Sequence, residues 1–170
     1  MRLLARNQRG VAAVEFALVA GTLSFAMLNC TDVARFYVQR MQLENAARMG
    51  AQAAWNSCDT TKLPATTNCT ALTTAVTTAV QATSLGTAVT LQSGSPSEGY
   101  YCVNGSGVLT LVSAVSAKPT DCSSVGSPTS QPGDYIKVVA KFTFRPMFGG
   151  VSVGSTLPTS ITSTAMMRLQ

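Results

Sequence analysis

The segment from Val11 to Leu28 constrains this chain more than any other feature. It reads VAAVEFALVAGTLSFAML, and its only charged residue is Glu15. As an α-helix rising 1.5 Å per residue, this segment is about 27 Å long, close to the thickness of the hydrocarbon core of a bilayer. A buried helix of a soluble domain rarely has so long an apolar run. We therefore predict that residues 11–30 form one membrane-spanning helix.

The charges that flank this segment predict its orientation. Arg2, Arg6 and Arg9 precede the apolar run, and basic residues are enriched on the cytoplasmic side of membrane helices. Arg35 and Arg40 follow the run, so the asymmetry is partial. On this basis we predict a cytoplasmic N-terminus and a C-terminal domain on the opposite, periplasmic side of an inner membrane.

Two other roles for the apolar segment are weighed against this one. A secretory signal peptide has a shorter apolar core and a small-x-small cleavage site, which Met27-Leu28-Asn29 does not match. An ordinary single-span anchor fits the length but leaves Glu15 unexplained. A carboxylate among lipid tails costs several kcal/mol unless it finds a partner.

A helical pattern continues beyond the predicted membrane segment. Apolar residues recur mostly at steps of three and four between Asp32 and Trp55, which is typical of an amphipathic helix; they are Val33, Phe36, Tyr37, Met41, Ala47, Ala51 and Ala54. The first proline after this stretch is Pro64. The pattern predicts one helix from Val11 to Trp55, with residues 31–56 as an amphipathic extension that packs against a domain formed by residues 57–170.

The remainder of the chain predicts a second helix and several strands. Helical spacing of apolar residues extends over Ala71–Leu85, and the polar stretch Asn56–Thr70 before it reads as a turn region. Runs rich in Val, Thr, Ile, Tyr and Phe predict strands at Thr87–Gln92, Tyr100–Val103, Gly107–Val115, Tyr135–Phe144 and Ser160–Arg168. The expected fold is α+β, with a long N-terminal helix, a short second helix and a small antiparallel sheet.

Five cysteines indicate an oxidising compartment. Cys58, Cys69, Cys102 and Cys122 form two pairs that are close in sequence, while Cys30 lies near the end of the apolar run. Four cysteines in a small, loop-rich domain are typical of two disulfides. Proximity favours Cys58 with Cys69 and Cys102 with Cys122, although four cysteines allow three pairings and four free thiols remain the alternative.

Composition argues against several classes of function. The chain has 12 Lys and Arg, 7 Asp and Glu, and no histidine. Basic residues outside the N-terminus are scattered singly, unlike those of a nucleic-acid-binding surface. Without histidine or a C-x-x-C pair, neither a histidine-based triad nor a zinc site is expected. The carboxylates are widely spaced and no phosphate-binding loop is present. We expect no enzyme activity, cofactor, metal or small-molecule substrate.

The segment RGVAAVEFALVA, with QLENAARMGAQAA after it, resembles the TadE branch of the Tad (Flp) type IV pilus system. The C-terminal stretches GDYIKVVAKFTFRPMF and ITSTAMMRLQ are also similar to TadE-like minor pilins, more loosely. In type IV pilins and pseudopilins, a short basic leader ends in glycine, a prepilin peptidase cuts after it, and the fifth residue of the mature chain is glutamate. Here Gly10 matches the last leader residue, Val11 the new N-terminus and Glu15 the fifth residue.

The resemblance implies a pilin-like fold and a role in pilus assembly. Residues 1–10 would be the prepilin leader, and the partners would be the prepilin peptidase, other pilins, and the proteins of the Tad/Flp assembly platform. Val11 departs from the Phe or Met that is common at the first mature position. The expected function is that of a minor pilin or pseudopilin that acts in surface attachment. The alternative is a bitopic inner-membrane protein whose outer domain binds a partner and has no pilus role.

Overall fold

The computed structural model describes residues 8–150 and 152–170, with side chains from residue 10 onward. The chain divides into two compact units. The first unit is formed by the chain up to Val38 together with Arg145–Thr159, and the second by Gln39–Phe144 together with Ser160–Gln170. Helix α1 contributes to both, because it extends from Gln8 to Asn56. The long predicted helix is thus confirmed, with one or a few more residues at each end.

In the first unit, the apolar run lies on α1 with its side chains uncovered. Phe16 is 75% exposed, Leu18 68% and Met27 66%. This is the one helix, within the part of the chain that the structure describes, that is long and apolar enough to cross a membrane. Apolar side chains with no protein covering are expected where lipid is the solvent, and these observations fit a single-pass membrane protein.

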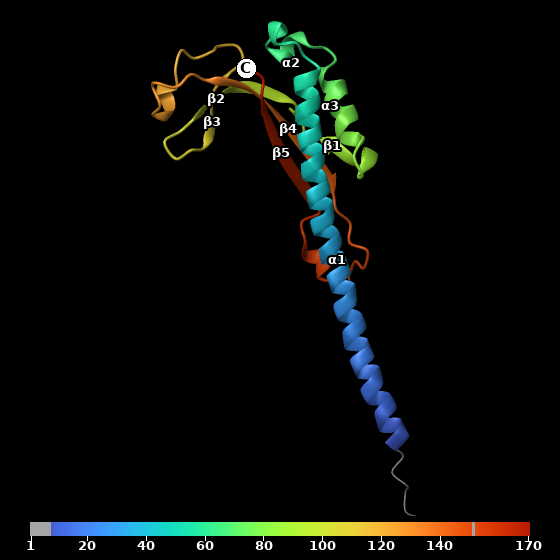
Figure 1. The fold of residues 1–170 in the computed structure, drawn as a ribbon. Coiled ribbons are helices and arrows are strands. Elements are labelled where there is room, and N and C mark those ends of the chain that lie inside the picture. The colour runs from blue at the N-terminus through green and yellow to red at the C-terminus, as the bar shows by residue number, and fades with distance from the viewer. Residues whose placement is uncertain (1–7, 151) are drawn as a thin grey trace, which may run out of the picture. The chain divides into compact units, whose positions relative to one another are not determined.

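All five strands of the sheet belong to the second unit (Figure 1): β1 (Val89–Leu91), β2 (Ser97–Val103), β3 (Leu109–Ala114), β4 (Gly133–Thr143) and β5 (Ser160–Arg168). Every pairing is antiparallel. Strand β4 is central and pairs with β5 along one edge. Along its other edge, β4 pairs with β2 near its N-terminal end and with β1 near its C-terminal end. Strand β3 pairs with β2. The predicted antiparallel sheet is confirmed. Its order follows from pairings between distant segments, which local sequence does not specify.

One face of β4 supplies much of the core. Ile136, Val138 and Ala140 are fully buried, whereas Lys137 is half-buried and Lys141 exposed on the opposite face. The alternation arises because successive side chains of a strand point to opposite faces of the sheet. The sheet therefore buries one face and leaves its basic residues in solvent.

Small residues of α1 line the core of the second unit. The buried positions recur at helical spacing and are Leu43, Ala46, Ala47, Gly50, Ala51 and Ala54. The predicted stripe was wrong for Tyr37 and Met41, which are 56% and 58% exposed. A Cβ atom on Gly50 would lie 2.7 Å from Cγ2 of Val80 and 3.2 Å from Cγ1 of Val138. From Ala46 to Ala54 the buried positions are therefore all small residues, because α1 packs too closely at Gly50 for larger ones.

The second helix is shorter than predicted. Helix α3 extends from Leu72 to Gln81 and buries Leu72, Val76 and Val80, as its spacing predicted. The helix stops before Leu85, because the hydroxyl of Thr83 donates to the carbonyl of Val80 and Gly86 takes a positive φ of 58°. Both features are typical of the end of a helix.

The polar stretch Asn56–Thr70 was predicted as a turn region, but it contains two short helices. They are the 3₁₀ helix η1 (Thr60–Lys62) and α2 (Ala65–Asn68). Asp59 caps η1, because its carboxylate accepts the backbone N–H of Thr61 at 2.9 Å. Three further 3₁₀ helices lie in connecting segments: η2 (Gly86–Ala88), η3 (Ser123–Val125) and η4 (Val153–Thr156).

Enlarging Gly50 is expected to destabilise the second unit. Gly50→Leu gains about 1 kcal/mol of helix propensity. It also forces four carbon atoms against Val80 and Val138, and even smaller insertions into a packed core typically cost about 1–3 kcal/mol. The cost of overpacking should therefore exceed the gain in helix propensity. We expect a lower unfolding midpoint for the full chain in detergent, measured by circular dichroism. Met49→Leu is the control, because Met49 is 49% exposed and its substitution should change stability by no more than about 0.5 kcal/mol. Equal midpoints for the two variants would contradict the close packing.

Candidate membrane and assembly segment

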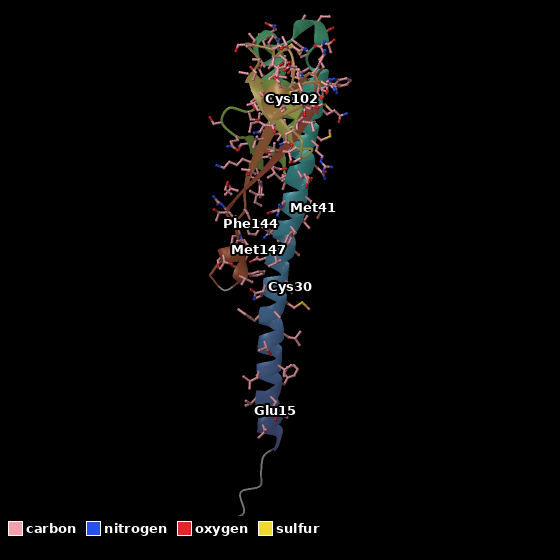
Figure 2. The ribbon with its side chains drawn as sticks, turned by 90° about the vertical axis from the view of Figure 1, so that its left-hand side faces the viewer. Glu15, Cys30, Met41, Cys102, Phe144 and Met147 are labelled. Atoms are coloured by element: carbon pink, nitrogen blue, oxygen red, sulfur yellow. A yellow bond between two sulfur atoms is a disulfide. The ribbon has the colours of Figure 1, made fainter. Side chains whose placement is uncertain are left out.

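The predicted processing and assembly residues lie on the exposed N-terminal part of α1. Gly10, Val11 and Glu15 are all exposed, and a Cβ atom on Gly10 would meet nothing within 4 Å. Glu15 lies between Val11 and Val19, one turn away on either side, which are 61% and 58% exposed. No described side chain forms a hydrogen bond or ion pair with Glu15. Its carboxylate, labelled in Figure 2, is therefore free to meet a group outside this chain.

The basic residues predicted to set the orientation are described only in part. Arg2 and Arg6 lie outside the described residues. The backbone of Arg9 belongs to α1, but its side chain is not described. The orientation of the helix therefore stays a prediction from the sequence.

Asp32 is a polar site that the sequence analysis missed. Its side chain is fully buried, and one carboxylate oxygen accepts the backbone N–H of Met147 at 2.8 Å. The other accepts the N–H of Phe148 at 3.2 Å and the hydroxyl of Ser152. One helical side chain thus satisfies two backbone groups and a hydroxyl of the segment Arg145–Thr159, as a buried carboxylate requires.

Two neighbouring contacts complete the attachment of this segment to α1. The side-chain oxygen of Asn29 accepts the backbone N–H of Val153 at 2.7 Å. Gly154 lies so close to Asp32 that an added Cβ would be 2.8 Å from Cβ of Asp32. Cys30, between the two anchoring residues in the helix, is exposed and is the free cysteine. Residues 29–32 therefore hold Arg145–Thr159 against the helix immediately after the apolar run.

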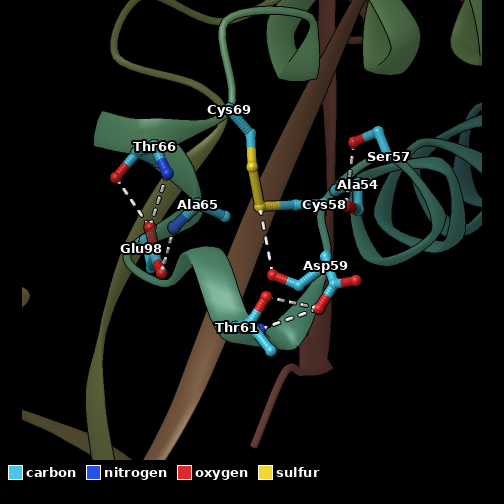
Figure 3. Close-up of a disulfide and its surroundings, with 9 residues drawn as sticks. All are labelled: Ala54, Ser57, Cys58, Asp59, Thr61, Ala65, Thr66, Cys69 and Glu98. Carbon is cyan, nitrogen blue, oxygen red and sulfur yellow. Dashed lines mark hydrogen bonds between the residues drawn. A yellow bond between two sulfur atoms is a disulfide. The ribbon is translucent and has the colours of Figure 1, made fainter.

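The four remaining cysteines form two disulfides in the second unit. Cys58 is bonded to Cys69, and Cys102 to Cys122, which is the pairing that proximity favoured. The first bridge joins the segment after α1 to the end of α2 (Figure 3). The second joins β2 to the long connection before β4, and both of its cysteines are buried. Each bridge therefore holds a polar segment that has few apolar residues to fix it.

Glu98 on β2 holds α2 in place beside the first disulfide. Its two carboxylate oxygens accept the backbone N–H groups of Ala65 and Thr66, at 2.9 and 2.7 Å, and one also accepts the Thr66 hydroxyl (Figure 3). Charge-assisted bonds of this kind are stronger than bonds between neutral groups. The carboxylate of Glu98 therefore has a structural role in linking α2 to the sheet.

A carboxylate pair is formed across the sheet, although the wide spacing of acidic residues predicted none. Asp134 at the start of β4 is 4% exposed, and its Oδ1 has no hydrogen-bond donor among the described atoms. Burial, and then the nearby charge of Glu98, raise the pKa of Asp134 to about 6, while Lys118 opposes the shift. A protonated Asp134 can donate to Glu98, which relieves the repulsion between the two carboxylates.

This raised pKa predicts a stability change with pH. The unfolded chain, in which the pKa of Asp134 is near 3.8, releases its proton at lower pH than the folded chain. The stabilisation from protonated Asp134 is therefore present below pH 3.8 and is lost as the pH rises to about 6. We expect the unfolding free energy of the native chain to fall relative to that of Asp134→Asn across this window, measured by denaturant titration.

Asp121→Asn is the control for that pH dependence. Hydrogen bonds from the side chain and backbone of Ser123 lower the pKa of Asp121. Its stabilisation is therefore lost as the pH falls, which is the opposite sign. If the native chain and Asp134→Asn keep the same difference in stability from pH 4 to 7, folding does not raise the pKa of Asp134, which would contradict this prediction.

Asp32, Glu98 and Asp134 share the reason why sequence analysis missed them. The partners of Asp32 are 115 to 120 residues away, and those of Glu98 are 32 or 33 residues away. No motif or local spacing links such positions. An acidic residue four positions beyond an 18-residue apolar run is the only local signal at Asp32, since an unpaired charge there is costly.

Together, these features define a class of protein: one exposed apolar helix long enough to cross a membrane, joined to an α+β domain with two disulfides. Residues 10–52 match the family model described as TadE-like protein. Residues 10–52 are therefore similar to TadE-like proteins. No curated protein and no solved structure matches the chain.

Proposed function

We propose that this protein is a minor pilin or pseudopilin of a Tad/Flp-type pilus, cut by a prepilin peptidase between Gly10 and Val11. The observation that carries the proposal is the position of Glu15, five residues after Gly10 in a TadE-like segment. Its side chain is exposed and has no partner among the described residues. The new amino group of Val11 in an adjacent subunit is the cation that would pair with it. Two buried charges that neutralise each other offset part of their desolvation cost.

The proposed role is structural and not catalytic. The protein would lie in the bacterial inner membrane with residues 1–10 in the cytoplasm and residues 57–170 in the periplasm, and it would enter or nucleate a pilus for surface attachment. Two disulfides support the periplasmic side, because such bonds persist in oxidising compartments. Its proposed partners are the peptidase, other pilins and the assembly platform, with no nucleic acid or small-molecule substrate.

The mass of the protein purified from its own membrane tests this proposal against a bitopic protein with no pilus role. Cleavage after Gly10 removes three arginines, so the formal net charge falls from +5 to +2. We expect the shortened chain in cells with prepilin peptidase and the full chain in cells without it. Gly10→Leu is expected to leave the precursor uncut, while Gly21→Leu, at another exposed and unobstructed glycine of α1, is the control. A chain that still begins at Met1 in peptidase-containing cells would favour the bitopic alternative.

A further inference from the structure

The segment Arg145–Thr159 presents apolar side chains outward at the end of the membrane segment. Met147 is 65% exposed and Val153 is 52% exposed. The backbone N–H groups of these same two residues bond to Asp32 and Asn29. Figure 2 shows Met147 beside α1, near the level of Cys30. Both apolar side chains are thus fixed next to the first helical turn after the apolar run.

The position of that turn matches the headgroup region of a bilayer. If residues 11–28 fill the hydrocarbon core, Asn29 lies at its boundary and Asp32 lies about 6 Å beyond Leu28, at 1.5 Å per residue. The polar interface on each side of the hydrocarbon core is roughly 5–8 Å thick. The anchoring bonds therefore hold Met147 and Val153 at the depth of the lipid headgroups.

The charges of the segment suit the same surface. Arg145 is exposed and is its one charged residue, so the segment is basic. The carboxylate of Asp32 is buried and accepts three hydrogen bonds, so its charge does not face the lipid directly. Exposed apolar side chains with one basic residue and no exposed acidic residue are compatible with a phospholipid surface, and burial of the apolar side chains would supply most of the binding energy.

We propose that Arg145–Thr159 is a second membrane contact of this protein: a segment held by Asn29 and Asp32 that lies on the outer face of the bilayer and inserts Met147 and Val153 among the phospholipid headgroups. This inference rests on insertion of α1 in a membrane and does not depend on a role in a pilus. The contact would fix both the depth and the rotation of α1, because it lies on one side of the helix.

Tryptophan fluorescence in brominated lipid tests this proposal. Trp55 is the only tryptophan, so Trp55→Phe gives a silent background for single probes. The full chain is reconstituted in vesicles of phosphatidylcholine and phosphatidylglycerol, with or without bromine on acyl carbons 6 and 7. Met147→Trp and Val153→Trp report on the segment, Leu23→Trp on the membrane helix, and Val108→Trp is the matched control, since Val108 is an exposed valine of the second unit.

We expect bromolipid to quench Leu23→Trp, Met147→Trp and Val153→Trp, and to leave Val108→Trp unchanged. Lack of quenching at both segment probes, with Leu23→Trp quenched, would overturn the second contact and leave the membrane anchor standing. Unquenched Leu23→Trp would refute the anchor itself, and with it the contact. A blue-shifted but unquenched Met147→Trp would mean that protein covers the segment, which also overturns the proposal. Intact disulfides on non-reducing gels check that each variant has folded.

Discussion

Cells that carry Glu15→Ala are expected to insert, process and fold this protein normally and yet to lose most of its association with other pilins. A lone carboxylate costs about 2.5–3.5 kcal/mol at the centre of a membrane helix on insertion scales. Glu15 is the fifth residue of the apolar run, so its cost is no larger than this, and alanine should insert at least as well. We propose that the amino group of a neighbouring subunit offsets this cost only in the assembly. Alanine cannot form that ion pair, so the substitution should weaken association between subunits. The readouts are crosslinking to pilins and pilus counts by electron microscopy.

Glu44→Ala is the matched control for Glu15→Ala. Glu44 is an exposed glutamate of the same helix, and it pairs with Arg48 one turn away. An exposed pair of this kind contributes about 0.3–0.5 kcal/mol, so its loss should leave piliation unchanged. If Glu15→Ala cells crosslink and form pili like the parent strain, Glu15 has no assembly role. Failure of the variant to accumulate would assign the residue to targeting or stability instead.

Asp32→Ala is expected to release Arg145–Thr159 from the helix. The substitution leaves the N–H groups of Met147 and Phe148 and the hydroxyl of Ser152 without their acceptor. Hydrogen bonds to a charged group contribute about 1.5–3 kcal/mol each. The state in which Arg145–Thr159 is bound to α1 should therefore be destabilised by about 3 kcal/mol or more. We expect amide hydrogen exchange at Met147 and Phe148 to accelerate by at least about 100-fold, as 1.4 kcal/mol is a factor of ten.

The neighbouring anchor gives a graded control. Asn29→Ala removes one bond, from the N–H of Val153, to a neutral acceptor, and should accelerate exchange roughly tenfold at most. The disulfides of the second unit should form in both variants. Slow exchange at Met147 in Asp32→Ala would show that the segment is held by its other contacts and that the buried carboxylate contributes little.

The elements of this fold could be predicted because each depends on residues that are adjacent in sequence. Val11–Leu28 specified a helix by its length and composition, and Ile136, Val138 and Ala140 specified a strand by their alternation. The packing of α1 was wrong at Tyr37 and Met41 because large apolar side chains were expected inside. The buried face of α1 in this region instead carries Phe36 and Leu43; local spacing of apolar residues did not identify which side of the helix faces the rest of the chain.

The disulfides could be predicted for the same reason, because the paired cysteines are separated by only 11 and 20 residues. Cleavage between Gly10 and Val11 and the assembly role of Glu15 stay predictions from a short contiguous pattern. The buried carboxylates of Asp32 and Asp134 have partners or neighbours that only the folded chain brings near. The contribution of these carboxylates to the stability of the fold depends on their burial, and burial cannot be inferred from an isolated acidic residue in the sequence.

The two disulfides also limit how far this chain can be stretched. The Cys58–Cys69 and Cys102–Cys122 bridges close segments of 11 and 20 residues, and an extended residue spans about 3.3–3.6 Å. A pulling force that unfolds the second unit therefore cannot extend roughly 100 Å of its polypeptide while the bridges are intact. The tension bypasses both closed segments, the second of which contains β3, and passes through the sulfur atoms. These segments therefore stay compact even when β4 has separated from the other strands.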